Sequence, residues 1–135
     1  MTAAGVLLEL VEAGVVLWVD GDRLCYRAPV GVLTAELRDA VAARRTAVIA
    51  LVRAGAVLPV SVAAWHDEAR SQAEERAGIM EFDGGVVREV AEREAERLVR
   101  LEHARAFVAR NALVVQPQAA AVAGERPGGG PHRRL

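Results

Sequence analysis

The stretch from Gly14 to Pro29, GVVLWVDGDRLCYRAP, constrains the fold more than any other part of the chain. Two runs of strand-favouring residues, 15–19 and 24–28, flank the turn-like segment DGDR. Gly21 supplies the positive φ that a tight hairpin turn needs. With Gly21 and Asp22 as the turn residues, the pattern predicts an antiparallel hairpin in which Asp20 faces Arg23.

Alternation along the two strands divides the hairpin side chains between two faces. One face is expected to meet the core, because a lone hairpin is barely stable in water: Val15, Leu17, Val19, Leu24, Tyr26 and Ala28. The other face mixes aromatic, aliphatic and charged side chains, as recognition surfaces do: Val16, Trp18, Asp20, Arg23, Cys25 and Arg27. Two alternatives stay open. A later helix or a second copy of the chain covers Trp18, or a one-residue register slip exchanges the faces.

Helical patterns surround the hairpin. Thr2 can cap a helix over residues 3–13, and a second helical stretch runs over residues 34–54. Its apolar stripe is interrupted near Thr46, which could cap a separate third helix. The predicted order is helix, strand, strand, helix, helix, which makes residues 1–55 a small α+β unit.

A short linker with Pro59 separates this unit from a second segment, residues 61–110. There the pattern predicts a helix over residues 62–80 with Ser61 as its cap, a turn at FDGG, and a helix over residues 86–109. Together they form an αα-hairpin, with two favourable i,i+4 pairs on its second helix, Glu89–Arg93 and Glu96–Arg100. The last segment, residues 111–135, becomes rich in Ala, Gly and Pro and is predicted to be a disordered tail.

Composition excludes several classes of protein. The net charge is −1, and residues 61–110 carry eleven acidic residues against eight arginines, which argues against direct nucleic-acid binding. Cys25 is the single cysteine, so an intramolecular disulfide and a multi-cysteine metal site are excluded. The sequence has no apolar run of membrane-spanning length and no signal-peptide pattern, so neither a membrane partner nor export is expected. The expected compartment is the cytoplasm.

No constellation of residues predicts catalysis. His66, Asp67 and Glu68 are adjacent on a predicted helix, so their side chains point in different directions and cannot converge on one metal ion. His103 is expected at the surface, and Cys25 has no oriented base beside it in the sequence. We therefore predict a protein that is not an enzyme, with no catalytic residues, no metal and no cofactor.

Several short motifs of the first 55 residues occur at distances typical of one family. They are the apolar first helix ending at Gly14, then Leu17-Trp18, Gly21-Asp22, Leu24, Tyr26-Arg27-Ala28-Pro29, Gly31, Leu33-Thr34 before Glu36-Leu37, and the closing Ile49-Ala50-Leu51 with Gly55. With these motifs, the segment resembles the TubC-type N-terminal docking domain found at the start of nonribosomal peptide and polyketide synthetase subunits.

The resemblance implies a helix–strand–strand–helix–helix fold that is often homodimeric. It also implies capture of a short C-terminal segment of a partner protein, which lies along the hairpin partly as an added strand. On this chain the partner-binding residues would be Val16, Trp18, Arg23, Cys25 and Arg27. Arg23 and Arg27 would suit an acidic partner tail or its terminal carboxylate.

This chain departs from the family pattern in one respect, because an αα-hairpin follows the docking unit where a synthetase module is expected. Residues 75–85 resemble segments of small proteins of phages and other mobile elements. The alternative function is therefore an accessory protein linked to DNA replication or transfer. An enzyme is a third alternative, and it would need histidines and carboxylates to converge in one pocket.

Overall fold

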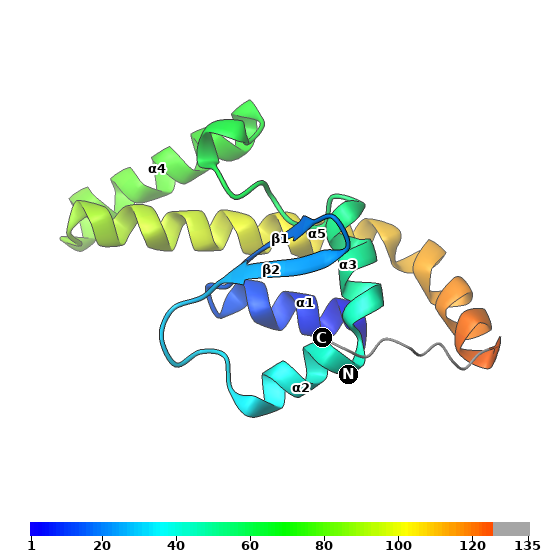
Figure 1. Ribbon diagram of the computed structural model, residues 1–135. Coiled ribbons are helices and arrows are strands. Elements are labelled where there is room, and N and C mark those ends of the chain that lie inside the picture. The colour runs from blue at the N-terminus through cyan, green and yellow to red at the C-terminus, as the bar shows by residue number, and fades with distance from the viewer. Residues whose placement is uncertain (126–135) are drawn as a thin grey trace.

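The computed structural model describes the backbone of residues 1–125 and the side chains of residues 1–111 (Figure 1). The fold is α+β, as predicted, and mostly helical. Its elements are α1 (Ala3–Glu12), β1 (Val16–Asp20), β2 (Arg23–Arg27), α2 (Ala35–Ala43), α3 (Arg45–Arg53), the short 3-10 helix η1 (Val62–Ala64), α4 (Asp67–Gly84) and α5 (Arg88–Glu125). Apart from Asn111, the predicted disordered tail lies beyond the described side chains, and residues 126–135 lie outside the described chain.

The hairpin forms with the predicted register. Asp20 pairs with Arg23, and the pairing continues without a bulge along both strands. Gly21 has a φ of 66°, whereas Asp22 has no positive φ. Positive φ at the first turn residue alone is the pattern of a type II′ turn, whose twist matches that of the strands. The register slip left open by the sequence is therefore excluded.

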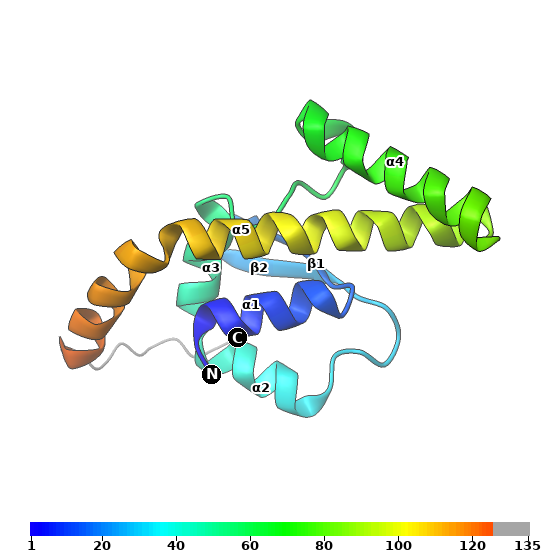
Figure 2. The ribbon, with the colours of Figure 1, turned by 180° about the vertical axis from the view of Figure 1, so that it is seen from behind.

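The inner face of the hairpin packs on a core to which α5 also contributes. Val15 and Leu17 of the hairpin are 2% and 4% exposed. Leu101 and Ala104 of α5 are 5% and 0% exposed, and they belong to the same apolar cluster as Leu7 of α1. Seen from behind, α5 runs alongside α1 (Figure 2). The second predicted segment therefore helps to build the core of the first.

The helices of the first segment begin and end where the sequence predicts, with one exception. The Thr2 and Thr34 hydroxyls accept hydrogen bonds from backbone N–H groups at the starts of α1 and α2, at 2.9 and 3.1 Å. The break between α2 and α3 falls at Arg44, whose φ and ψ of −126° and 26° interrupt the helix. Thr46 was predicted to cap α3, and this was wrong because the helix already begins at Arg45.

The first helix of the αα-hairpin begins later than predicted. Residues 62–64 form only η1, and the extended backbone of Trp65 then interrupts the predicted helix. His66 replaces the predicted cap Ser61, since its Nδ1 accepts a hydrogen bond from the N–H of Ala69 at 3.2 Å. The Trp65 side chain is 3% exposed, so burial of the indole accounts for the break.

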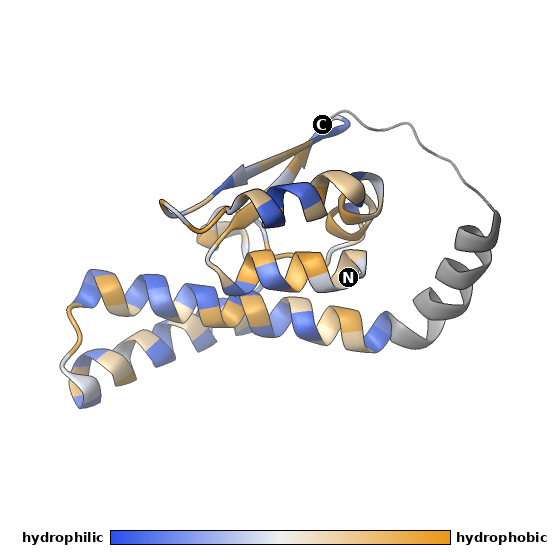
Figure 3. Ribbon diagram, turned by 90° about the horizontal axis from the view of Figure 1, so that it is seen from below, coloured by the Kyte–Doolittle hydropathy of each residue, from blue (hydrophilic) through white to orange (hydrophobic). Residues whose placement is uncertain are grey.

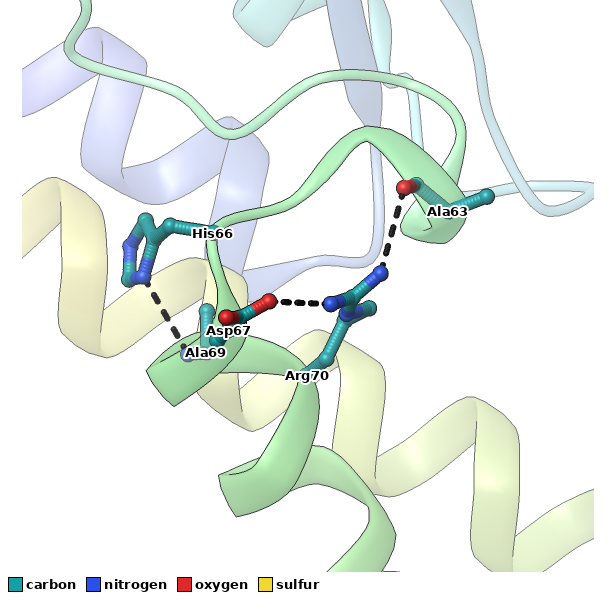
Figure 4. Close-up of polar contacts among 5 residues, drawn as sticks. All are labelled: Ala63, His66, Asp67, Ala69 and Arg70. Carbon is teal, nitrogen blue, oxygen red and sulfur yellow. Dashed lines mark hydrogen bonds and ion pairs between the residues drawn. The ribbon is translucent and has the colours of Figure 1, made fainter.

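Polar contacts fix both ends of α4. At its start, Arg70 forms an ion pair with Asp67 and donates a hydrogen bond to the carbonyl oxygen of Ala63 in η1 (Figure 4). Asp67 also lies in the first turn, where a negative charge is favourable to the helix dipole. At its end, Gly85 has a φ of 66° and closes the helix in the left-handed conformation.

The αα-hairpin packs through small side chains: Ala69, Ala73 and Ala77 on α4, with Ala91, Ala95 and Val99 on α5. The predicted pairs Glu89–Arg93 and Glu96–Arg100 are not formed within 4 Å. The ion pairs observed on α5 include Arg88–Glu92 and Glu94–Arg97. Apolar residues lie along the contact of α1 with α5 and again around the turn that joins α4 to α5 (Figure 3). In the described part of the chain, no helix has both the length and the apolar character needed to cross a membrane.

Candidate docking site

The outer edge of β2 presents backbone groups that no other strand pairs with in the part of the chain that the structure describes. In an antiparallel ladder, residues alternate between pairs that exchange hydrogen bonds and pairs whose N–H and C=O groups point outward. A two-residue turn closes on a bonded pair, so Leu24 and Tyr26 direct their backbone groups away from β1. Within residues 1–111, hydrogen bonds from outside the ladder reach only the Gly21 and Asp22 carbonyl oxygens of the hairpin. The edge can therefore accept a further strand.

A groove lies beside this edge, between β2 and α2. Its volume is about 270 Å³, and most of its lining is apolar: Val15, Leu17, Leu24, Tyr26, Leu33 and Val41, with Arg38 and Arg45 at its polar side. Tyr26 is 49% exposed, so its ring is accessible to a ligand. Side chains of an added strand alternate between two faces. Every second side chain of a segment paired with β2 would therefore point towards this groove.

Two arginines of α3 hold the hairpin turn in place. Arg45 Nη2 donates to the carbonyl oxygen of Asp22 at 3.3 Å, and Arg53 donates to the carbonyl oxygen of Gly21. These contacts fix the hairpin to the helix beneath it. A fixed edge loses little conformational freedom when a ligand binds, which favours affinity.

The residues predicted to bind a partner lie on the opposite face of the hairpin, and the structure places them in different surroundings. Val16 and Arg27, at the open end, line a cavity of about 530 Å³ that is shared with α5. Trp18 is half-buried and lines a shallower cavity with residues 57–60. Arg23 is exposed and Cys25 is half-buried. The face is thus partly covered at the open end, and partner binding by these residues stays a prediction.

Arg100 of α5 holds the linker beside β1. Its Nη1 donates to the carbonyl oxygens of Leu58 and Pro59 at 3.4 and 3.1 Å, and its Nη2 donates to that of Val60 at 2.9 Å. The guanidinium carbon lies 5.0 Å from the centroid of the Trp65 ring, which is cation–π distance. Trp65 Nε1 donates to the Pro59 carbonyl oxygen at 2.8 Å. The two edges of the hairpin therefore differ, because the linker borders β1 and a groove borders β2.

Arg100 is buried, and none of the carboxylates of residues 1–111 lies within ion-pair distance of it. It is 8% exposed, and burial lowers the pKa of its guanidinium, an effect opposed by Glu96 and reinforced by Arg27. Arg97 is the contrasting case, since its hydrogen bonds with Glu94 raise the pKa of the arginine and lower that of the glutamate. Among the described residues, the contacts that stabilise the charge of Arg100 are hydrogen bonds to carbonyl oxygens and a cation–π contact.

Sequence reasoning missed the groove and the role of Arg100. Leu33, just before α2, and Val41 within α2 belong to an apolar stripe that indicates packing against the hairpin, but the stripe does not show that a groove remains open there. No local signal points to Arg100, because its acceptor at Pro59 lies 41 residues away in the sequence.

The two histidines in the described part of the chain, His66 and His103, have structural partners. His66 caps α4, and His103 Nε2 lies 2.9 Å from the carbonyl oxygen of Gly55. Their ring centroids are 6.2 Å apart. Among the residues that the structure describes, no group of three or more His, Cys, Asp or Glu side chains is placed to hold a metal ion.

Comparison with known proteins agrees with the geometry of the first segment. The family model described as the TubC N-terminal docking domain matches residues 5–53, which span α1, the hairpin, α2 and α3. The chain has no significant match among curated proteins or solved structures. Neither α4 nor α5 lies within the matched region. Residues 5–53, about a third of the chain, are therefore similar to the TubC N-terminal docking domain.

Proposed function

We propose that this protein is a docking module that captures a short segment of a partner protein along its hairpin, as a strand added to the outer edge of β2. The observation that carries the proposal is an unpaired strand edge beside an apolar groove. The similarity of residues 5–53 to the TubC N-terminal docking domain supports it, because such domains mediate protein–protein docking in synthetase systems. Backbone hydrogen bonds would supply affinity, and alternate side chains would supply selectivity.

The dimensions of β2 limit the ligand. The strand has five residues, so a paired segment of similar length spans roughly 17 Å. The side chains on the outer face of that segment would meet Arg23, Cys25 and Arg27, with Val16 and Trp18 on the neighbouring strand. Arg23 and Arg27 are exposed and have no carboxylate within 4 Å among residues 1–111, so an acidic C-terminal segment is the ligand we propose.

The module we propose is not an enzyme, and it is organised in three parts. Residues 1–55 form the docking domain, residues 61–110 form a helical extension, and residues 111–135 form a tail. We also propose that two copies associate through the extension. Four apolar side chains near the α4–α5 turn are 46–84% exposed, and exposed apolar groups mark association surfaces: Ile79, Phe82, Val87 and Val90. Sedimentation velocity measures the proportions of monomer and dimer. The substitution Phe82→Ser should increase the proportion of monomer.

One experiment tests the docking edge directly. Peptides of random sequence with free C-termini are displayed and selected on the full chain, and the Kd of a selected peptide is measured by fluorescence anisotropy. Tyr26→Pro removes an N–H group that points outward, so the ladder to β1 keeps its hydrogen bonds while the docking edge loses a donor. Tyr26→Thr is the matched control, because it also lacks the ring but keeps the N–H group.

We expect Tyr26→Pro to weaken binding at least tenfold beyond the effect of Tyr26→Thr. Trp18→Ala and Arg27→Glu should also abolish capture, with helix content unchanged by circular dichroism. Equal binding by the Pro and Thr variants would exclude strand addition at β2. Normal binding by both Trp18→Ala and Arg27→Glu would exclude the outer face as the selecting surface.

A further inference from the structure

The cavity at the open end of the hairpin carries an unbalanced set of charges. About 530 Å³ in volume, it lies between the hairpin base and α5. Four arginines line it against two glutamates: Arg27, Arg93, Arg97 and Arg100, with Glu94 and Glu96. Three of the four arginines and both glutamates are on α5, outside the family match at residues 5–53. The charged side chains that α5 contributes to the cavity therefore lie outside the part of the chain that matches the docking domain.

Among the described side chains, one arginine of the cavity forms an ion pair with a neighbouring carboxylate. Arg97 is paired with Glu94 at 2.5 Å, and it also donates to the carbonyl oxygen of Glu12 at 2.7 Å. Within residues 1–111, the other three arginines have no carboxylate within 4 Å. Arg100 is 92% shielded from solvent, and its charge is attracted by Glu96 and repelled by Arg27. A carboxylate entering the cavity would relieve this repulsion and accept charge-assisted hydrogen bonds.

The direction of an added strand decides which part of a partner reaches the cavity. Antiparallel pairing is the commoner arrangement, and β2 runs from the turn to the open end, where Arg27 is its last residue. A partner segment antiparallel to β2 therefore has its upstream end at the cavity and its C-terminus near the turn. The carboxylate that reaches the cavity then belongs to a side chain, not to the chain terminus.

We propose that this cavity is a carboxylate subsite of the docking surface, which binds an Asp or Glu side chain just upstream of the partner residues that pair with β2. The inference rests on the proposed function, because the cavity lies at the end of the proposed docking edge. It assigns a role to α5: the helix extends the docking surface past the hairpin and selects for acidic partner segments.

A double-mutant cycle tests the subsite. A peptide selected on the full chain is compared with a version in which its upstream Asp or Glu is replaced by Asn or Gln. The Kd of each of the two peptides is measured for the wild-type chain and for the variants Arg93→Gln and Arg105→Gln. Arg93 is an exposed residue of the cavity, so its replacement should not disturb folding. Arg105 is exposed on the same helix but is not among the residues that line the cavity, so it serves as the control.

We expect the acidic peptide to bind about tenfold more weakly to Arg93→Gln than to the wild type, with no change for Arg105→Gln. The peptide with Asn or Gln in place of its upstream acid should bind all three chains equally. If selected peptides need no upstream acid while Tyr26→Pro still abolishes binding, the subsite is wrong and docking at β2 stands. A third version of the peptide has an amidated C-terminus; if Arg93→Gln no longer affects its binding, the terminal carboxylate is the occupant and our inference is overturned. If Tyr26→Pro binds as well as Tyr26→Thr, docking at β2 fails first.

Discussion

Replacing Leu101 by Ala tests whether α5 is part of the core that holds the docking hairpin. Leu101 is 5% exposed and packs in the cluster that contains Leu7 and Leu10 of α1. It lies outside the matched residues 5–53, so a docking domain that folds independently of α5 would not respond to its replacement. In the packing observed here, a substitution in the helical extension must destabilise the hairpin unit.

The size of the effect follows from the burial of the side chain. The substitution removes three carbon atoms, and at about 0.8 kcal/mol per buried CH₂ the lost transfer free energy is roughly 2.4 kcal/mol. The remaining cavity raises the loss to about 3–4 kcal/mol. A domain is stable by only about 5–15 kcal/mol, so this loss is large. Arg105→Ala on the same helix is the control: Arg105 is exposed and forms none of the ion pairs observed among residues 1–111, so the loss should stay below about 1 kcal/mol.

Urea unfolding measures the loss, with two signals. In a Trp65→Phe background, fluorescence reports Trp18 alone and hence the hairpin, while far-ultraviolet circular dichroism reports the helices. We expect Leu101→Ala to lower the urea midpoint equally in both signals, with an unchanged slope. If the Trp18 transition keeps its midpoint while the helical signal moves, the hairpin does not depend on α5 and our reasoning is refuted.

Two further variants examine single contacts. Trp65→Phe removes the N–H group that donates to the Pro59 carbonyl oxygen at 2.8 Å, so we expect a loss of about 1–2 kcal/mol in the free energy of unfolding; no loss would mean that the bond is not formed in solution. Glu94→Gln should destabilise the protein at neutral pH. Arg97 lowers the pKa of Glu94 below its usual 4.5, so the pair stabilises the fold above that pH, and the difference from wild type should vanish as the pH falls through the lowered pKa. A difference that is constant with pH would contradict this.

The fold near the hairpin was predictable because its signals are local. Gly21 and Asp22 fix the turn, and the turn fixes every pair of the ladder. Thr2 and Thr34 cap their helices through bonds to residues only three positions away. In contrast, α4 begins where Trp65 is buried, and that burial depends on α5. Because this helix break depends on residues that are distant in the sequence, the local residue pattern does not predict it.

The surroundings of the candidate site were less predictable for a related reason. An apolar stripe shows that a helix has a buried face, but it does not identify the element that covers that face. Leu101 lies on the apolar face of α5, and its spacing in the sequence does not show that it packs in the same cluster as Leu7 and Leu10 of α1. Arg100 was expected to pair with Glu96 one turn away, whereas its hydrogen bonds go to linker carbonyl oxygens. Both outcomes depend on how α5 crosses the first segment.

The charges of β2 also bear on what can pair with its open edge. An exposed strand edge can pair with the same edge of a second copy. In an antiparallel pairing of two β2 strands centred on Cys25, Arg23 of each copy would lie opposite Arg27 of the other. Like charges placed directly opposite each other destabilise such a ladder, whereas an acidic segment in the same position forms favourable pairs. The two arginines that favour an acidic ligand therefore also disfavour self-association through β2, which leaves the edge available for the partner.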